Sequence, residues 1–202
     1  MYNWIYAHRG IWDSSSEMNS KRAIDAAKAG GFSIETDIRD FSQTIVISHD
    51  PVVCENRLTL NQVLDSQYSF ALNIKSDGLL KLLEPFHDLI KNSNSFLFDG
   101  SIPEMIKYKN SGLPYALRLS EYEKTLSWNA DVIWVDGFHS DWWLDSPSIE
   151  VILQTKKVVL VSPEIHGRDY RRTWDWILEK RNLGHENLCI CTDFAQELKD
   201  QL

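Results

Sequence analysis

The chain has 202 residues, of which 43% are hydrophobic and 25% are charged, and its formal net charge is -8. This length and composition predict one folded domain over residues 1–202 and exclude a disordered chain. The acidic balance argues against a general electrostatic grip on nucleic acid or on an anionic membrane. A small anionic substrate remains open as a partner, because a local pocket can be positive on a negative protein. The oligomeric state is not predicted by these numbers.

The cysteines Cys54, Cys189 and Cys191 do not make a disulfide framework, because their number is odd and two of them form a Cys-x-Cys pair in an apolar run. Buried free thiols are the simpler interpretation, and they are typical of a reducing compartment. The first residues lack the basic and long apolar regions of a signal peptide, and no stretch approaches the ~18 apolar residues of a membrane span. We therefore expect a cytoplasmic protein without an integral membrane segment.

In chain order, short apolar runs that end in polar residues alternate with helical stretches. The runs predicted as strands are Trp4–His8, Phe32–Ile38, Phe70–Lys75, Ser95–Asp99, Pro114–Leu119, Val132–Asp136, Lys157–Val161 and Asn187–Thr192. The helices predicted between them are Ser20–Gly30, Thr59–Leu64, Leu79–Lys91, Ile102–Lys109 and Tyr170–Lys180. Near-continuous apolar strands that alternate with helices predict a parallel sheet covered on both faces. Eight such units favour an α/β fold of the small TIM-type (β/α)8 barrel class over an open doubly wound sheet.

One segment interrupts this alternation. After Phe32–Ile38 comes a second apolar run, Thr44–Ser48, and the link RDFSQ between them leaves no room for a helix. We therefore predict a hairpin excursion after the second barrel strand. Such a hairpin returns His49 to the end of the barrel at which Glu35 and Asp37 lie.

Polar and ionisable residues recur at the predicted carboxyl ends of the strands, which is where barrel enzymes place their sites. These residues are His8, Arg9, Glu35, Asp37, Asn73, Lys75, Asp99, Arg118, Asp136, Glu164, His166 and Asp193. Each of them alone also fits a structural role, such as a histidine satisfied at the edge of the core. Their convergence at one rim from separate short segments favours a functional site.

Glu35 and Asp37 are two residues apart on one predicted strand, so their carboxylates share a face. Two such carboxylates repel each other unless a cation lies between them, and Mg²⁺ or Ca²⁺ prefers oxygen ligands. The pattern therefore predicts one divalent cation. Pairing of the carboxylates with Arg9 and Lys75 is the alternative that the residues leave open.

The remaining groups at this rim suit phosphoryl chemistry. Arg9 offers a planar donor fork that matches phosphate oxygens. A metal neutralises the charge that develops during an in-line displacement. His8 and His49 can supply the base and the acid that such a displacement needs, although the sequence does not assign which is which.

Four segments carry a resemblance to a known family: YAHRG at 6–10, NS at 19–20, IETDIR at 34–39 and VISHDP at 46–51. In order, spacing and residue type they resemble the glycerophosphodiester phosphodiesterase family, which lies within the wider superfamily of phosphatidylinositol-phospholipase-C-like phosphodiesterases. The likeness is close over the first 50 residues and looser beyond residue 76. There it rests on the order of strands and helices and on Thr192-Asp193, similar to the family's closing Thr-Asp.

The resemblance implies a barrel phosphodiesterase of lipid metabolism that acts on glycerophosphodiesters or related small phosphodiesters. It implies that His8 and His49 are catalytic, that Arg9 contacts phosphate, and that Glu35 and Asp37 hold the metal. The family's third metal carboxylate is replaced here, because the next strand carries Asn73 before a retained Lys75. An amide oxygen can still bind a divalent cation, and another acid such as Asp99 can complete its ligand shell. The family's Pro-Glu-Asn-Thr is also altered, to EMNS at 17–20.

Substrate binding is predicted for Lys75, Arg118, Trp142 and His166 in addition to Arg9. The segment FHSDWW at 138–143 and the segment PEIHGR at 163–168 follow two of the later strands. Aromatic rings beside polar groups suit a glycerol, inositol or sugar headgroup. The alternative for Trp142 and its neighbour Trp143 is that they cover a helix as part of the core.

Two other functions compete with a phosphodiesterase. One is a protein that binds phosphate or a sugar phosphate on the same barrel without catalysis, which Asn73 favours and the two histidines disfavour. The other is a lyase or aldolase that uses Lys75 as a Schiff base. The leaving alcohol of a phosphodiester is not predicted by the sequence.

Overall fold

The computed structural model describes residues 2–53, 57–124, 128–144 and 146–202. Within these residues, eight parallel strands form a barrel in the order β5-β4-β2-β1-β9-β8-β7-β6. The additional strand β3 pairs with β2 outside this order. The bounds are β1 Tyr2–His8, β2 Phe32–Phe41, β3 Thr44–Ile47, β4 Phe70–Ile74, β5 Phe96–Phe98, β6 Ala116–Leu119, β7 Val132–Val135, β8 Lys157–Val161 and β9 Leu188–Thr192. The end strands β5 and β6 meet at a parallel bridge between Leu97 and Tyr115, so the barrel is nearly closed. The predicted TIM-type barrel is confirmed.

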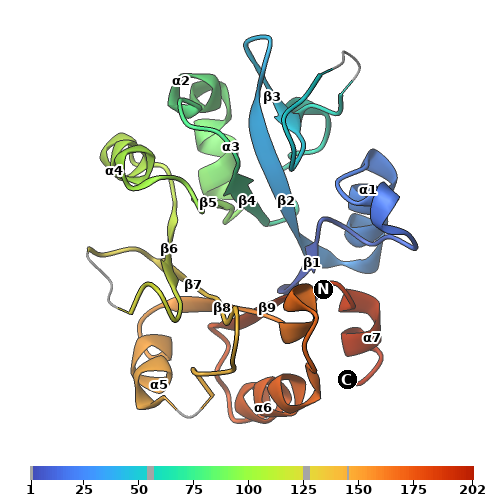
Figure 1. The fold of residues 1–202 in the computed structure, drawn as a ribbon, viewed down its shortest axis with the longest axis vertical. Coiled ribbons are helices and arrows are strands. Elements are labelled where there is room, and N and C mark those ends of the chain that lie inside the picture. The colour runs from blue at the N-terminus through green and yellow to red at the C-terminus, as the bar shows by residue number, and fades with distance from the viewer. Residues whose placement is uncertain (1, 54–56, 125–127, 145) are drawn as a thin grey trace.

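Helices lie outside the ring of strands (Figure 1). Their bounds are α1 Lys21–Gly30, α2 Leu80–Leu83, α3 His87–Asn92, α4 Ile102–Ser111, α5 Pro147–Leu153, α6 Arg171–Asn182 and α7 Ala195–Lys199. Short 3-10 turns occupy Ser15–Glu17, Leu60–Gln62, Glu84–Phe86 and Pro163–His166. No helix of the described part of the chain is long and apolar enough to cross a membrane.

The ends of α1 follow from its sequence. The hydroxyl of Ser20 accepts a hydrogen bond from the backbone N–H of Ala23 at 3.1 Å, which caps the start of the helix. Gly31 ends it with a φ of 78°, a left-handed conformation that glycine adopts without steric cost. The predicted Ser20–Gly30 helix is thus confirmed.

Two other predicted helices are shorter than expected. The Leu79–Lys91 prediction becomes α2, a 3-10 turn and α3 in succession, because Pro85 lies inside it and cannot donate a backbone hydrogen bond. The Thr59–Leu64 prediction becomes one 3-10 turn, in which Thr59 and Gln62 form a reciprocal cap. Neither difference alters the order of the barrel strands.

The excursion after β2 is confirmed. β3 pairs antiparallel to the far end of β2, with Ile38 opposite Ile47. The backbone N–H of Ser48 then donates to the carbonyl of Asp37 at 3.0 Å. This bond holds the residue that follows, His49, beside the strand that carries both predicted metal carboxylates.

Aromatic rings fill the barrel interior below its mouth. The rings of Phe98 and Trp134 stack with centroids 4.0 Å apart, and Phe96 contacts both of them and Tyr6. Strands β4 and β9 are buried along their whole length, as expected for strands covered by helices on one side and by these rings on the other. Cys189 and Cys191 are buried free thiols in β9, and Cys54 lies outside the described residues.

Candidate active site

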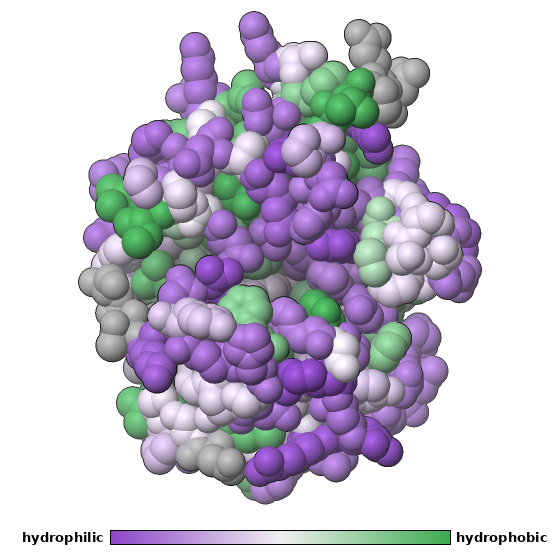
Figure 2. All heavy atoms as spheres, in the orientation of Figure 1, coloured by the Kyte–Doolittle hydropathy of each residue, from purple (hydrophilic) through white to green (hydrophobic). Residues whose placement is uncertain are grey.

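A cavity of about 300 Å³ lies at the carboxyl ends of the barrel strands. It brings together most of the site residues predicted from the sequence, namely His8, Arg9, Glu35, His49, Asn73, Lys75, Asp99, Arg118 and His166. Phe98 and Trp134 contribute apolar wall, and Asp136 and Phe138 also line the cavity. Figure 2 shows hydrophilic surface around the hollow at the centre of this face. Asp37 is fully buried and contacts two of the lining side chains from below the surface.

His8 is held on both sides by carboxylates. Its Nδ1 lies 2.6 Å from Oδ1 of Asp193, and its Nε2 lies 3.8 Å from Oε2 of Glu35. Burial alone would lower the pKa of His8, but the hydrogen bond to Asp193 and the charge of Glu35 outweigh it and raise the pKa. The imidazole is therefore fixed in orientation and favoured in its protonated form.

The orientation of Asp193 depends on a further carboxylate. Glu164 accepts the backbone N–H of Asp193 at 3.1 Å and also accepts the hydroxyl proton of Thr192. Glu164 therefore holds the backbone of Asp193, and the Asp193 side chain in turn holds the ring of His8. The sequence places Glu164 and Asp193 at predicted strand ends but predicts no catalytic or binding role for either.

Arg9 turns away from the strand in an unusual backbone conformation. Its φ is 58°, and the following Gly10 has a φ of 91° and packs so closely on α1 that an added Cβ would lie 2.5 Å from the backbone of Ala23. This turn directs the guanidinium toward Asp37, whose Oδ2 lies 2.9 Å from Nε of Arg9. The positive φ is consistent with a functional constraint at this position.

Asp37 is the centre of a network of charges and hydrogen bonds. Lys75 Nζ lies 3.3 Å from its Oδ1, and the side-chain amide of Asn19 donates to its Oδ2 at 2.8 Å. The Asn19 carbonyl oxygen in turn accepts the hydroxyl proton of Thr36 at 2.7 Å. Asn19 belongs to one of the segments that carry the family resemblance, but no pattern in the sequence predicts its contact with Asp37.

Glu35 is almost completely buried, two residues before Asp37. Burial and the charge of Asp37 raise the pKa of Glu35 to about 7, although His8 and the cationic side chains oppose them. A positive charge placed near a carboxyl with a raised pKa stabilises its ionised form.

The side-chain oxygens of Glu35, Asp37 and Asn73 are of the chemical type that a hard divalent cation prefers. Asp37 Oδ1 and Asn73 Oδ1 are both buried and accept no hydrogen bond from the described residues, and these two residues are register partners on β2 and β4. Oxygen donors from two carboxyls and one amide are the kind that Mg²⁺ and Ca²⁺ prefer. Among the described residues, however, no group of three or more His, Cys, Asp or Glu side chains is arranged to hold a metal ion. Asp99 is engaged elsewhere, by Arg118 at 3.1 Å.

His49 differs from His8 in its surroundings. Its side chain is 48% exposed, and its Nδ1 contacts Oδ1 of the exposed Asp50 at 2.8 Å. Arg39 donates to the His49 carbonyl at 3.1 Å and to the Lys75 carbonyl at 3.1 Å, which ties the hairpin to β4. The structure therefore places His49 at the cavity wall while leaving its ring open to solvent.

The opposite wall carries a second pair of histidine and aspartate. His166 Nε2 lies 2.7 Å from Oδ1 of Asp136, and the ring of Phe138 contacts the His166 ring at 5.2 Å. The guanidinium carbon of Arg118 lies over the ring of Phe138, 5.7 Å from the ring centroid. In the sequence, the position of His166 after a predicted strand marks it as a candidate site residue, whereas Phe138 stands out only as part of the aromatic segment at 138–143.

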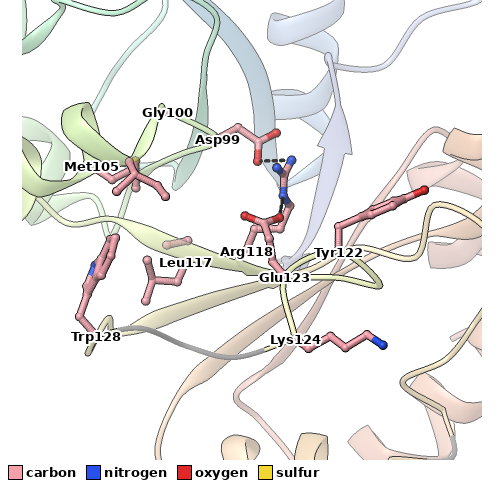
Figure 3. A pocket seen from close by; sticks show the side chains of 11 residues that line it. Asp99, Gly100, Met105, Leu117, Arg118, Tyr122, Glu123, Lys124 and Trp128 are labelled. Carbon is pink, nitrogen blue, oxygen red and sulfur yellow. Dashed lines mark hydrogen bonds and ion pairs between the residues drawn. The ribbon is translucent and has the colours of Figure 1, made fainter.

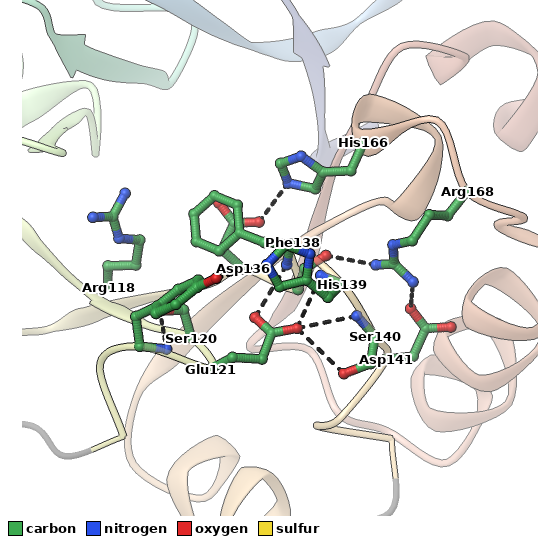
Figure 4. Close-up of polar contacts among 12 residues, drawn as sticks. Arg118, Ser120, Glu121, Asp136, Phe138, His139, Ser140, Asp141, His166 and Arg168 are labelled. Carbon is green, nitrogen blue, oxygen red and sulfur yellow. Dashed lines mark hydrogen bonds and ion pairs between the residues drawn. The ribbon is translucent and has the colours of Figure 1, made fainter.

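Glu121 fixes the loop that carries Phe138. Its carboxylate accepts the backbone N–H groups of Phe138 and His139 at 3.1 Å each and that of Ser140 at 3.0 Å (Figure 4). Burial by itself would raise the pKa of Glu121, but these backbone hydrogen bonds lower it to about 2. Glu121 lies in an irregular connection, where no periodic pattern marks it in the sequence.

Trp142 is not among the residues that line the cavity. Its indole N–H donates to the backbone carbonyl of Asp136 at 3.0 Å, and the side chain packs against the core. Trp143 is buried and contacts the ring of Trp176 at 5.6 Å. Both contacts match the structural alternative that the sequence left open for these tryptophans.

The fold and the polar cavity at its carboxyl end define an α/β barrel of the kind that binds or transforms small ligands at this end. No family model matches the chain, and no curated protein matches it. Among solved structures, the chain is similar to the crystal structure of glycerophosphodiester phosphodiesterase from Agrobacterium tumefaciens str. C58, with a TM-score of 0.65 and 14% identity. The match covers 99% of this chain and 100% of that one. At this identity the similarity establishes the fold.

Proposed function

We propose that this protein hydrolyses a glycerophosphodiester or a related small phosphodiester by acid–base catalysis with His8 and His49. The observation that carries the proposal is the cavity, in which both histidines, Arg9 and Lys75 line one space. Phosphate binding alone does not need two groups that transfer protons. The fold likeness to an enzyme described as a glycerophosphodiester phosphodiesterase supports the same reaction class.

The surroundings of the histidines suggest their roles. The raised pKa of His8 favours the imidazolium, so His8 is suited to give a proton to the leaving oxygen. The base at the entering oxygen is then His49, whose exposed ring can reach water or a substrate hydroxyl. Asp193 acts on His8 as a positioning residue, because a hydrogen bond at Nδ1 fixes which nitrogen faces the substrate.

The phosphate would lie between basic side chains of both walls. Arg9 and Lys75 approach from one side, Arg118 and His166 from the other, and all four line the cavity. A divalent cation, Mg²⁺ or Ca²⁺, would be held by Glu35, Asp37 and Asn73 and would neutralise charge on the phosphoryl oxygens. Asn73 brings no charge, so we expect weaker binding than three carboxylates would give. Substrate contact by Trp142 stays a prediction from the sequence.

The reaction proposed here belongs to lipid metabolism, and the buried free thiols Cys189 and Cys191 suit the reducing cytoplasm. The test is a screen of phosphodiesters, including glycerophosphocholine, glycerophosphoinositol and a cyclic phosphodiester, with Mg²⁺, with Ca²⁺ and with chelator. Turnover is expected on at least one of them, and His8→Ala should lower it by about 10² to 10⁴-fold. Tight binding of these compounds without turnover would instead support a phosphate-binding protein on the same barrel, the alternative that the uncharged Asn73 favours.

A further inference from the structure

The connection between β6 and β7 leaves part of the barrel wall without a helix. Residues 120–124 and 128–131, the described part of this connection, form no helix. Beside it lies a second cavity of about 260 Å³, bounded by α4, β6 and this connection. We call this cavity the lateral slot and define it by Ile102, Met105, Leu117, Trp128 and the inner pair Asp99 and Arg118 (Figure 3).

The wall of the lateral slot formed by α4 and Leu117 is apolar, whereas Tyr122, Glu123 and Lys124 give another part of its lining a polar character. Met105 and Leu117 are at most partly accessible, whereas Ile102 is 66% exposed at the edge. Ile106, one turn further along α4, is 42% exposed and does not line the slot. Figure 2 shows apolar surface at the edge of the molecule beside α4. An exposed aliphatic side chain at the edge of a cavity with one apolar wall suits the hydrocarbon part of a ligand.

The lateral slot adjoins the candidate active site. Asp99 and Arg118 line both cavities, so their side chains form the shared wall. Arg118 is held there by Asp99 at 3.1 Å and by Glu123. Lys124 also lines the slot, so the formal charges of two carboxylates, Asp99 and Glu123, are balanced by those of Arg118 and Lys124, and the lining carries no net charge that would select a charged group.

We propose that the lateral slot binds the hydrocarbon part of an amphiphilic phosphodiester, such as one with a single alkyl or acyl chain. This inference rests on the proposed function, because it places the phosphate in the neighbouring cavity beside Arg118. The ester substituent on the Arg118 side then extends over the shared wall toward Leu117 and Met105. Transfer of its methylene groups from water to these side chains supplies binding energy that a glycerol headgroup cannot provide.

The test is a series of ethyl-, hexyl- and decylphosphocholine, each used below its micelle concentration. Affinity is measured by calorimetry on His8→Ala protein, so that turnover does not interfere, and kcat/KM is measured on the wild type. Binding should tighten by up to about fourfold for each buried methylene until the slot is full. Ile102→Ser should weaken the binding of decylphosphocholine by about fivefold and leave the binding of ethylphosphocholine unchanged.

Ile106→Ser is the matched control, because it removes another exposed isoleucine from the same helix outside the slot. Leu117→Ser tests the inner wall, and Ile102→Ser keeps the test decisive if Leu117→Ser fails to fold. Equal affinity for the ethyl and decyl compounds would overturn the proposal, and so would a chain-length effect that Ile102→Ser and Ile106→Ser change alike. A chain-length effect in binding that Ile102→Ser alone reduces, without turnover of any phosphodiester, would support the slot and reject the proposed catalytic function.

Discussion

The two sides of the barrel mouth are built from different interactions. On the side of β1, β2 and β4, ionisable groups contact one another directly, with Arg9 and Lys75 against Asp37 and with His8 between two carboxylates. On the side of β6, β7 and β8, ion pairs such as His166 with Asp136 and Arg118 with Asp99 are joined by ring contacts and by backbone hydrogen bonds. There Phe138 contacts Arg118 and His166, and one carboxylate holds a whole loop.

This difference indicates a division of work. Charges that are buried and paired keep fixed positions, which suits the groups that transfer protons and stabilise a transition state. Rings and a backbone loop define the shape of the space that a substituent enters. We therefore expect substitutions on the first side to lower kcat and substitutions on the second side to change KM and substrate preference.

The largest effect is expected from the histidines. His8→Ala or His49→Ala should each lower kcat by about 10² to 10⁴-fold, the usual range for the loss of one acid–base group. The double variant should lose much less than the product of the two effects, because the residues act as a unit. Steady-state kinetics on the best phosphodiester measures this, with circular dichroism to show that all variants are folded.

His87→Ala is the control for general effects of removing a histidine, since His87 lies at the start of α3 beside the exposed Asp88. It should keep wild-type kcat. Near wild-type kcat in either single variant at position 8 or 49 would reject the mechanism with two histidines, whatever the substrate.

A smaller effect is expected from Arg9→Lys. Lysine keeps the charge beside Asp37 but lacks the planar fork that matches two phosphate oxygens. We expect kcat/KM to fall by about 10 to 100-fold, the equivalent of losing one or two charge-assisted hydrogen bonds. Arg22→Lys, at an exposed ion pair with Asp13, should leave kcat/KM unchanged. An unchanged kcat/KM in Arg9→Lys would remove Arg9 from the site.

The cation site can be tested through its uncharged ligand. Asn73→Asp places a third carboxylate near Glu35 and Asp37, so it should tighten Mg²⁺ or Ca²⁺ binding about tenfold, since ligand charge sets the affinity of such sites. Without a cation the same variant should be less stable, because three buried carboxylates repel one another. Calorimetric titration and thermal unfolding measure the two effects. Absence of binding at millimolar cation in both proteins, with activity that survives chelator, would show that the metal role is wrong.

The sequence predicted the barrel and the first side of the mouth because both follow from local patterns. Strand ends in a parallel barrel converge, so His8, Glu35 and Lys75 could be grouped from their positions after apolar runs. The hairpin was also predictable, since the link before Thr44 is too short for a helix. These features need only the period of a strand and the length of a connection.

Contacts between distant segments could not be predicted in the same way. The pair of His8 and Asp193 joins the first and last barrel strands, and Asn19 reaches Asp37 from a loop. Glu121 shows no pattern in its irregular segment, and its role depends on three backbone groups that carry no sequence signal. The hydrogen bond from the Trp142 indole to the backbone carbonyl of Asp136 likewise has no signal in the sequence.

The smallest effect is expected from Glu121→Gln, which tests the second side. The variant keeps one acceptor oxygen but loses the charge that faces the backbone N–H groups of Phe138, His139 and Ser140. We expect a loss of about 1–2 kcal/mol in the free energy of unfolding at pH 7. Because Phe138 lines the cavity, KM should rise a few-fold while kcat changes less.

The pH dependence distinguishes this role from general damage. The folded-state pKa of Glu121, about 2, lies below the value of about 4.3 expected for an unfolded chain, so its contribution is present above pH ~4.3 and lost as the pH falls through 2. The difference in unfolding free energy between wild type and Glu121→Gln should therefore be constant near neutral pH, shrink below pH ~4.3 and approach zero near pH 2. Urea unfolding at several pH values measures it, with the exposed Glu179→Gln as a control that should show no such trend. A difference that stays constant down to the lowest accessible pH would mean that the Glu121 charge does not hold the loop, and the second side of the mouth would then owe its shape to its ring contacts and to its other hydrogen bonds.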